Sequence, residues 1–211
     1  MAPDILLLGI ALALAMWLRP WRQLVGGALL TPLLACLTLL PWLWALPRLH
    51  DMPLHLQLSG ACAVVLMLGW PRAIGVFVVV TLLSGLIAPA DIWELTGQAV
   101  WEGVVPATLA VAFGALLRWL TGTHPFIYIL GRAFIGTALC TFAAGSLSQL
   151  VGHEPAHVSA SLGLVARWLL AWGDAFMTGM LAAIFVAFKP QWLATWSDSL
   201  YLKIGENHSD D

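Results

Sequence analysis

Charged side chains are scarce in this sequence. Only 9% of its 211 residues are Asp, Glu, Lys or Arg, whereas 61% are hydrophobic and the mean hydropathy is +0.90. A soluble domain carries about 25% charged residues, because its surface must face water. So few charges cannot cover a globule of this size, which excludes a soluble protein and indicates that lipid is the main solvent. The small net charge of −2 also argues against a nucleic-acid partner.

Cysteine and glycine-rich signatures are lacking too. Cys36, Cys62 and Cys140 lie far apart within apolar runs, odd in number and without a CxxC pair, so we expect small core residues rather than disulfides or a thiolate metal site. The Gly-rich loop that binds ATP phosphates is absent. Because the N-terminus has no basic region and no small-residue cleavage site, we expect residues 5–18 to form a retained helix rather than a signal peptide.

Long apolar runs are what the sequence does contain. A membrane-spanning helix needs about 20 mostly apolar residues. Seven runs qualify or come close, and the first, third and fourth are short: 4–18, 24–46, 54–70, 72–89, 99–120, 124–150 and 162–188. Proline and glycine mark the breaks, for example at Pro47 and at Gly69–Pro71. We therefore predict an all-α membrane protein, with a single bundle of about seven transmembrane helices over residues 1–192 and a cytoplasmic C-terminal tail over residues 193–211.

Basic residues predict the orientation through the positive-inside rule. If the C-terminus is cytoplasmic, the inner side holds six basic residues and the outer side holds only Arg48. The six are Arg19, Arg22, Arg72, Arg118, Lys189 and Lys203. The N-terminus then lies outside, and we expect an integral protein of the bacterial inner membrane. Many tryptophans lie near the expected helix ends, as in an interfacial aromatic belt.

This orientation places imidazoles and carboxylates together on the outer side. They are His50, Asp51, His55, Asp91, Glu94, Glu102, His153, Glu154 and His157. Such a surface attracts cations and offers nitrogen and oxygen ligands to a transition metal. The candidate ligands are His55, which lies inside an apolar run and needs a partner or a cavity, and His50 nearby. The alternative is a polar interfacial loop whose histidines bond to lipid headgroups or water.

Two further patterns suggest chemistry. The run His153–His157 matches the H-E-x-x-H pattern of zinc proteases, but Pro155 disturbs the helix that this motif needs, so a protease is disfavoured. Arg132, Arg167 and Asp174 lie deep in apolar runs, where each charge costs about 2.5–3.5 kcal/mol. We expect Arg132 to pair with Asp174, and such a pair could be purely structural.

Three stretches carry a resemblance to a known family. They are His55–Gly60 continuing to Leu68–Pro71, Ala99–Pro106, and Trp172–Met180 continuing to Phe188–Trp192. Together they resemble the CbiM-like substrate-binding membrane subunits (permeases) of energy-coupling-factor ABC transporters for cobalt and nickel, over about residues 54–192. The resemblance implies a seven-helix bundle with an external N-terminus and no ATPase of its own. It also implies a transmembrane coupling subunit and cytoplasmic ATPases as partners.

In that family, metal is held largely by a Met-His N-terminus together with an internal histidine. His55 matches the internal histidine, whereas the chain begins Met1-Ala2-Pro3-Asp4 and lacks the N-terminal one. The expected function is uptake of Co²⁺ or Ni²⁺, carried as substrate without a permanent cofactor, with His55 and His50 as ligands and no catalytic activity. The alternatives are a polytopic scaffold or assembly subunit without its own substrate, a transporter of an organic solute, and an intramembrane enzyme.

Overall fold

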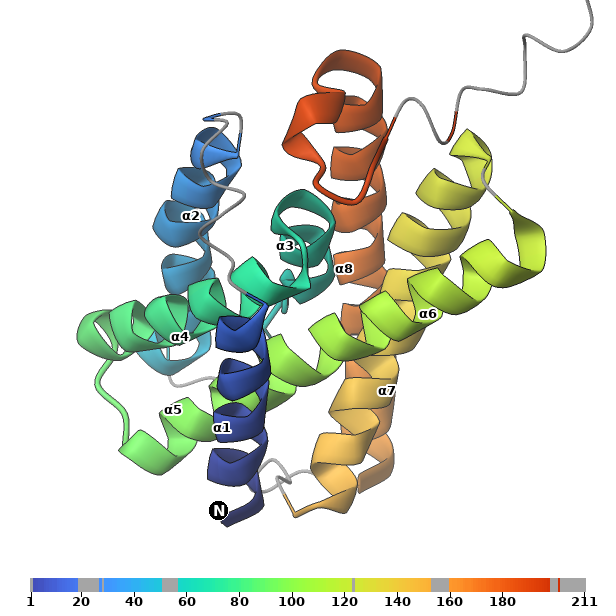
Figure 1. Cartoon of the computed structure of the whole chain (residues 1–211). Helices are drawn as coiled ribbons and strands as arrows, with labels where there is room; N and C mark the ends of the chain where they lie inside the picture. Colours follow the sequence, from blue (N-terminus) through green and yellow to red (C-terminus); the bar gives the residue numbers. More distant parts are fainter. Residues whose placement is uncertain are drawn as a thin grey trace, which may run out of the picture.

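A computed structural model describes residues 2–18, 27, 29–50, 57–122, 124–152, 160–197 and 201. Every regular element within these ranges is helical, which confirms the all-α class (Figure 1). In chain order the elements are α1 (Ala2–Trp17), α2 (Leu30–Leu49), α3 (Ala61–Leu68), α4 (Trp70–Ile87), α5 (Ile92–Gln98), the π-helix η2 (Ala99–Val104), α6 (Val105–Thr121), the π-helix η3 (Ile127–Ile135), α7 (Gly136–Leu150), α8 (Ala160–Phe188) and the 3₁₀ turn η4 (Pro190–Trp192).

Five helices in the described ranges are long and apolar enough to cross a membrane. They are Leu30–Leu49, Trp70–Ile87, Ile92–Thr121, Ile127–Leu150 and the helix that ends at Phe188. The third and fourth combine π- and α-helical segments into one continuous helix each. An integral membrane protein is therefore supported, but the predicted count of seven spans is not. Helix α1 is a shorter apolar helix, and α3 has only eight residues.

Glycine and proline explain most helix boundaries. Gly69 separates α3 from α4 with a φ of +78°, and Pro71 lies in the first turn of α4, where its missing N–H is not needed. The predicted break at Pro47 is wrong, because α2 continues through Pro41 and Pro47 to Leu49. Both prolines are buried in that helix, which packs along α4. Packing against a neighbouring helix compensates for the lost backbone hydrogen bonds.

The larger part of the core lies where α1, α2, α3 and α4 meet. Trp44 and Phe77 are fully buried there and stack with their ring centroids 6.1 Å apart. Ala11 and Ala15 are also buried, and α1 packs against α4, as small residues at helical spacing allow. All three cysteines are buried and free, which confirms their prediction as core residues.

A second part of the core holds the segment that follows α8. Leu193, Trp196 and Tyr201 are 3%, 8% and 6% exposed and pack with Leu66 and Tyr128. The predicted C-terminal tail thus belongs to the bundle over its first residues. The backbone N–H groups of Ala194 and Thr195 donate to the carbonyls of Met67 and Leu66, at 3.0 and 3.3 Å. This segment therefore covers the C-terminal end of α3.

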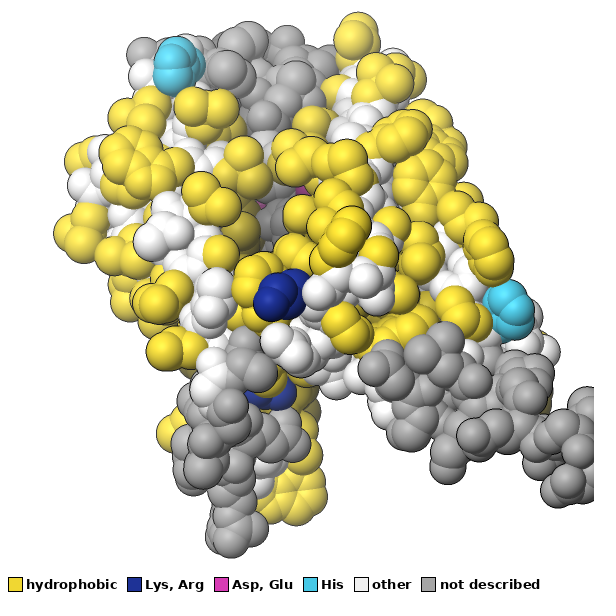
Figure 2. Space-filling model, turned by 90° about the horizontal axis from the view of Figure 1, so that it is seen from above, with side chains coloured by type: hydrophobic (Ala, Val, Ile, Leu, Met, Phe, Trp, Pro, Cys, Tyr) yellow, Lys and Arg dark blue, Asp and Glu magenta, His cyan; other side chains and the backbone are white. Residues whose placement is uncertain are grey.

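The outer surface of the bundle is apolar. Large hydrophobic side chains are strongly exposed on several helices, for example Leu86, Trp119 and Phe188 at 80%, 81% and 77%. From above, hydrophobic side chains cover most of the described surface, and a hollow opens between them with acidic atoms visible inside it (Figure 2). Exposed apolar side chains around a polar interior are what a lipid environment requires.

Candidate functional site

The site is built around the four residues that precede α3. The side chains of residues 57–60 and their backbone groups make hydrogen bonds to three different helices, and α3 itself contacts α2, α4, α6 and α8. The indole Nε1 of Trp44 in α2 donates to the carbonyl of Ser59 at 3.0 Å. Because α3 begins here rather than at the surface, its first backbone N–H groups lie inside the bundle and need acceptors.

The first of these, the N–H of Ala61, donates to Oγ of Ser59 at 3.2 Å, and Asp174 of α8 supplies acceptors for the two residues before it. Its two carboxylate oxygens accept hydrogen bonds from the backbone N–H groups of Ser59, at 2.9 Å, and Gly60, at 3.1 Å. The side chain is 4% exposed. The small residues beside it permit this contact: a side chain at Gly173 would press on Leu58, and Ala175 is fully buried. The Gly-Asp-Ala sequence thus lets the loop before α3 approach α8 closely.

Glu102 lies on the other side of Ser59, within the π-helix η2. The hydroxyl of Ser59 donates to the backbone carbonyl of Glu102 at 2.6 Å. Its neighbours Val100 and Gly103 are buried, whereas Glu102 keeps accessible surface in the middle of a 30-residue apolar helix. Sequence reasoning placed Glu102 near the outer end of the apolar run 99–120, whereas the continuous helix already begins at Ile92, so Glu102 lies more than two turns inside it.

A chain of polar side chains runs from this loop to the end of α2. Gln98 donates through Nε2 to Oε1 of Gln57 and to the carbonyl of Trp44, both at 3.0 Å. The Ser84 hydroxyl lies 3.4 Å from Oε1 of Gln98 and accepts a hydrogen bond from Arg48 at 3.1 Å. Arg48 also lies 3.8 Å from Glu94. This series of hydrogen bonds links the loop at residues 57–60 to the last turn of α2.

Two arginines within the apolar helices, Arg132 of η3 and Arg167 of α8, have separate surroundings. Arg167 lies across Gly145 of α7, with one terminal nitrogen 2.9 Å from where a Cβ would be, and it is close enough to Glu102 to interact with it electrostatically. Arg132 lies over the ring of Tyr128, 5.6 Å from its centroid. The predicted pairing of Arg132 with Asp174 is wrong. The Asp174 carboxylate accepts hydrogen bonds from two backbone N–H groups, and Arg132 makes no ion pair with a described residue.

Of the two histidines predicted as metal ligands, the structure describes only His50. His50 lies at the end of α2, is exposed, and its Nδ1 lies 3.1 Å from the carbonyl of Leu46. A carbonyl can only accept, so this contact is a hydrogen bond when Nδ1 carries a proton. His55 lies outside the described residues, as do Asp51 and the His153–His157 run. In the described ranges no three His, Cys, Asp or Glu side chains are grouped closely enough to hold a metal ion.

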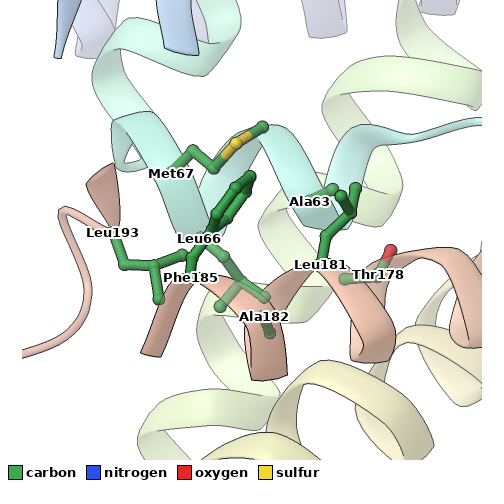
Figure 3. A pocket seen from close by; sticks show the side chains of 8 residues that line it. All are labelled: Ala63, Leu66, Met67, Thr178, Leu181, Ala182, Phe185 and Leu193. Carbon is green, nitrogen blue, oxygen red and sulfur yellow. The ribbon is translucent and has the colours of Figure 1, made fainter. Parts of the chain in front are cut away.

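A small pocket lies between α3 and α8 (Figure 3), and Thr178, one helical turn after Asp174 in α8, is among its lining residues. Its walls include Leu66, Met67, Thr178, Phe185 and Leu193, and its volume is about 10 Å³. A single water molecule needs about 10–15 Å³. The pocket therefore cannot hold a substrate, and the interior around Glu102 and Asp174 is the better candidate site.

Sequence reasoning missed much of this site. Asp174 was identified as a buried charge, but Trp44 was assigned to the interfacial belt although it is fully buried. Ser59, Gln98 and Glu102 were not recognised as site residues. Their common signal is a polar side chain at intramembrane depth, which a reading of apolar runs alone passes over.

A scan against protein-family models, a search of curated proteins and a search of solved structures each found no match to this chain.

Proposed function

We propose that this chain is the substrate-binding membrane subunit of an energy-coupling-factor type transporter that takes up a divalent transition-metal ion, Co²⁺ or Ni²⁺. The observation that carries the proposal is a convergence in space. The three sequence stretches that resemble the CbiM-like subunits meet at one point, where Asp174 binds Ser59 and Gly60 and where Ser59 binds Glu102. Segments more than 40 residues apart are joined there by residues of the resembling motifs themselves.

Charge supports a cation as the substrate. Glu102 and Asp174 bring two carboxylates to the interior, and among the described residues Arg167 is a cation that interacts electrostatically with Glu102. Two carboxylates and one guanidinium leave the described part of the site with an excess of negative charge. In a medium of low dielectric such an excess favours entry of a cation over an anion or a neutral solute.

Ligand chemistry supports a transition metal within that class. His55 lies two residues before Gln57, which is anchored to the bundle by Gln98. His50, at the start of the same connection, is exposed and contacts the carbonyl of Leu46 through Nδ1, so Nε2 is the ring nitrogen that this contact leaves available. Imidazole together with carboxylate suits Ni²⁺, Co²⁺ and Zn²⁺ better than Mg²⁺ or Ca²⁺. We propose His55 as the principal ligand, with His50 at the entrance and Glu102 facing the interior.

The remaining expectations belong to the same proposal. Without a Gly-rich phosphate-binding loop in the sequence, the energy for uptake would come from a transmembrane coupling subunit and cytoplasmic ATPases. The six-to-one distribution of basic residues favours an external N-terminus and a cytoplasmic C-terminus. The cell membrane would be the bacterial inner membrane.

Metal binding by the purified full-length chain tests the proposal. Metal content would be measured by mass spectrometry and affinity by titration with CoCl₂ and NiCl₂. We expect His55→Ala and Glu102→Gln to weaken binding about tenfold or more, as losses around metal sites do. His124→Ala is the matched control, because His124 is exposed and stacks on Phe126 at the opposite end of the bundle. No metal binding by the parent chain, or an equal loss in the control, would contradict the proposal.

A further inference from the structure

Arg132 is held in a fixed position by two neighbours. Its guanidinium lies over the ring of Tyr128, 5.6 Å from the centroid. On its other side is Gly114 of α6, where Nε is 2.6 Å from the place that a Cβ would occupy. Only glycine at position 114 leaves room for the arginine. The side chain is therefore oriented before any ligand arrives, which lowers the entropy cost of binding.

No carboxylate in the described part of the chain neutralises this guanidinium. Within the described ranges, Arg132 makes no hydrogen bond and no ion pair, and its Nε is buried without a partner, while the side chain as a whole remains part-exposed. The carboxylates in those ranges lie at the start of α1, before and within α5, in η2 and in the middle of α8: Asp4, Asp91, Glu94, Glu102 and Asp174. A cation at this depth needs an anionic partner or a wet cavity.

A second arginine lies one helical turn away. Arg118 follows Gly114 by four residues in α6, so the two positions share a face. Helical side chains lean toward the N-terminus of their helix, which directs Arg118 over the turn that contains Gly114. The Arg118 side chain is exposed and makes no hydrogen bond or ion pair with any described residue. Because α6 packs against η3, the two arginines lie on adjacent helices around one point.

The surroundings of the pair are apolar. Trp119, next to Arg118 on α6, is 81% exposed, and Phe126, just before η3, is 69% exposed. Leu116, Leu120 and Leu130 are 50%, 63% and 56% exposed on other faces of the same two helices, so both helices present apolar side chains to lipid. Two guanidinium groups on such a surface match a ligand with an anionic head and hydrocarbon chains. A small soluble anion would use the charges but leave this apolar surface in place.

We propose that Arg118 and Arg132 bind the phosphate of an anionic phospholipid, in the leaflet toward which α6 ends. Guanidinium groups bind phosphate oxygens in pairs through parallel N–H donors, and basic sites between transmembrane helices recognise anionic headgroups. The acyl chains then lie along the exposed apolar surface of α6 and η3. The site is separate from the interior around Asp174 and does not depend on the transport function.

Lipid-dependent stability of the purified full chain in mixed micelles tests this site. Phosphatidylglycerol, phosphatidylcholine and inorganic phosphate would each be added during thermal unfolding, with bound lipid counted by native mass spectrometry. We expect phosphatidylglycerol to raise the midpoint by several degrees more than phosphatidylcholine, and inorganic phosphate to have no effect at millimolar concentration. Arg132→Gln should weaken phosphatidylglycerol binding about tenfold, as loss of a charge-assisted hydrogen bond would.

Two more variants keep the test valid if Arg132→Gln does not fold. Arg118→Gln alters only an exposed side chain, and Gly114→Ala displaces the guanidinium of Arg132 without changing the charge. Both should reduce the phosphatidylglycerol effect. The matched controls are Arg48→Gln, which removes an arginine already bound to Ser84 at the other end of the bundle, and Gly75→Ala, where a Cβ meets nothing within 4 Å. A full phosphatidylglycerol effect in Gly114→Ala and Arg118→Gln, or an equal effect of inorganic phosphate, would overturn the proposal.

Discussion

The two ends of α3 are stabilised by different means. At the N-terminal end a charged side chain, Asp174, accepts from two backbone N–H groups of the loop before the helix. At the C-terminal end the acceptors are the carbonyls of Leu66 and Met67, and neutral backbone N–H groups of residues 194 and 195 donate to them. Both partners are distant in sequence, by 115 residues at Ser59 and by 129 at Leu66.

The difference shows what a short helix inside a bilayer requires. An eight-residue helix leaves four N–H groups and four carbonyls without partners within the helix. A helix that crosses the membrane exposes these groups to water, but α3 ends inside the bundle, where each unmade hydrogen bond costs several kcal/mol. The carboxylate at the N-terminus also interacts favourably with the helix dipole. We therefore expect the Asp174 end to contribute more to stability than the C-terminal end.

Removal of the Asp174 carboxylate should have the largest effect on this helix. Asp174→Ala leaves the N–H groups of Ser59 and Gly60 without acceptors in a site that excludes water, at about 1–3 kcal/mol for each. We expect the free energy of unfolding to fall by about 3 kcal/mol or more. Unfolding by sodium dodecyl sulfate in mixed micelles, followed by circular dichroism, would measure the loss.

Asp174→Asn separates charge from hydrogen bonding, because the amide retains one acceptor oxygen. It should lose about half as much stability as Asp174→Ala. Glu94→Ala serves as the control, since Glu94 is 48% exposed and its contact with Arg48 is long, at 3.8 Å. If Asp174→Ala unfolded no more easily than Glu94→Ala, the capping role of the carboxylate would be refuted.

Gly60 gives a smaller effect from the same end. Its φ of +64° is a left-handed conformation, which costs a residue with a Cβ about 1–2 kcal/mol. A Cβ there would meet Leu40 no closer than 3.7 Å, so the cost of Gly60→Ala comes from the backbone alone. We expect that loss in the free energy of unfolding, measured in the same titration. Gly60→Asn should recover part of it, because asparagine tolerates the left-handed region, and an equal loss in both variants would point to side-chain crowding instead.

Much of the fold could be predicted from the sequence, for a physical reason. Lipid demands apolar side chains and internally bonded backbone, so composition alone predicts helices in a membrane. The break at Gly69–Pro71 was also predictable, because glycine and proline have strong local effects. Pro47 was not, since whether a proline ends a helix depends on the packing of neighbours that the local sequence does not contain.

The site was harder to predict because its contacts are long-range. Asp174 is recognisable as a buried charge, but nothing in the local sequence indicates that its partners are two N–H groups rather than Arg132. The start of α3 is equally hidden, because the predicted apolar run begins at residue 54 and continues through Gly60. The predicted run that contains Glu102 begins at residue 99, whereas the helix begins at Ile92. The choice of hydrogen-bond partners is made by the tertiary structure.

The C-terminal end of α3 should give the smallest effect, and it separates side-chain from backbone contributions. Thr195 donates through Oγ to the carbonyl of Leu66 at 3.0 Å and also lies 2.8 Å from the hydroxyl of Tyr128. Thr195→Val removes both side-chain contacts but leaves the backbone N–H bonds of residues 194 and 195, so we expect a loss of about 1 kcal/mol. Tyr128→Phe removes only the hydrogen bond between the Tyr128 and Thr195 hydroxyls, so it should cost less. The two variants combined should lose little more than Thr195→Val alone, because they share one hydrogen bond. Losses that simply add would mean that the hydroxyls of Thr195 and Tyr128 do not share a hydrogen bond and that each stabilises this end through other contacts.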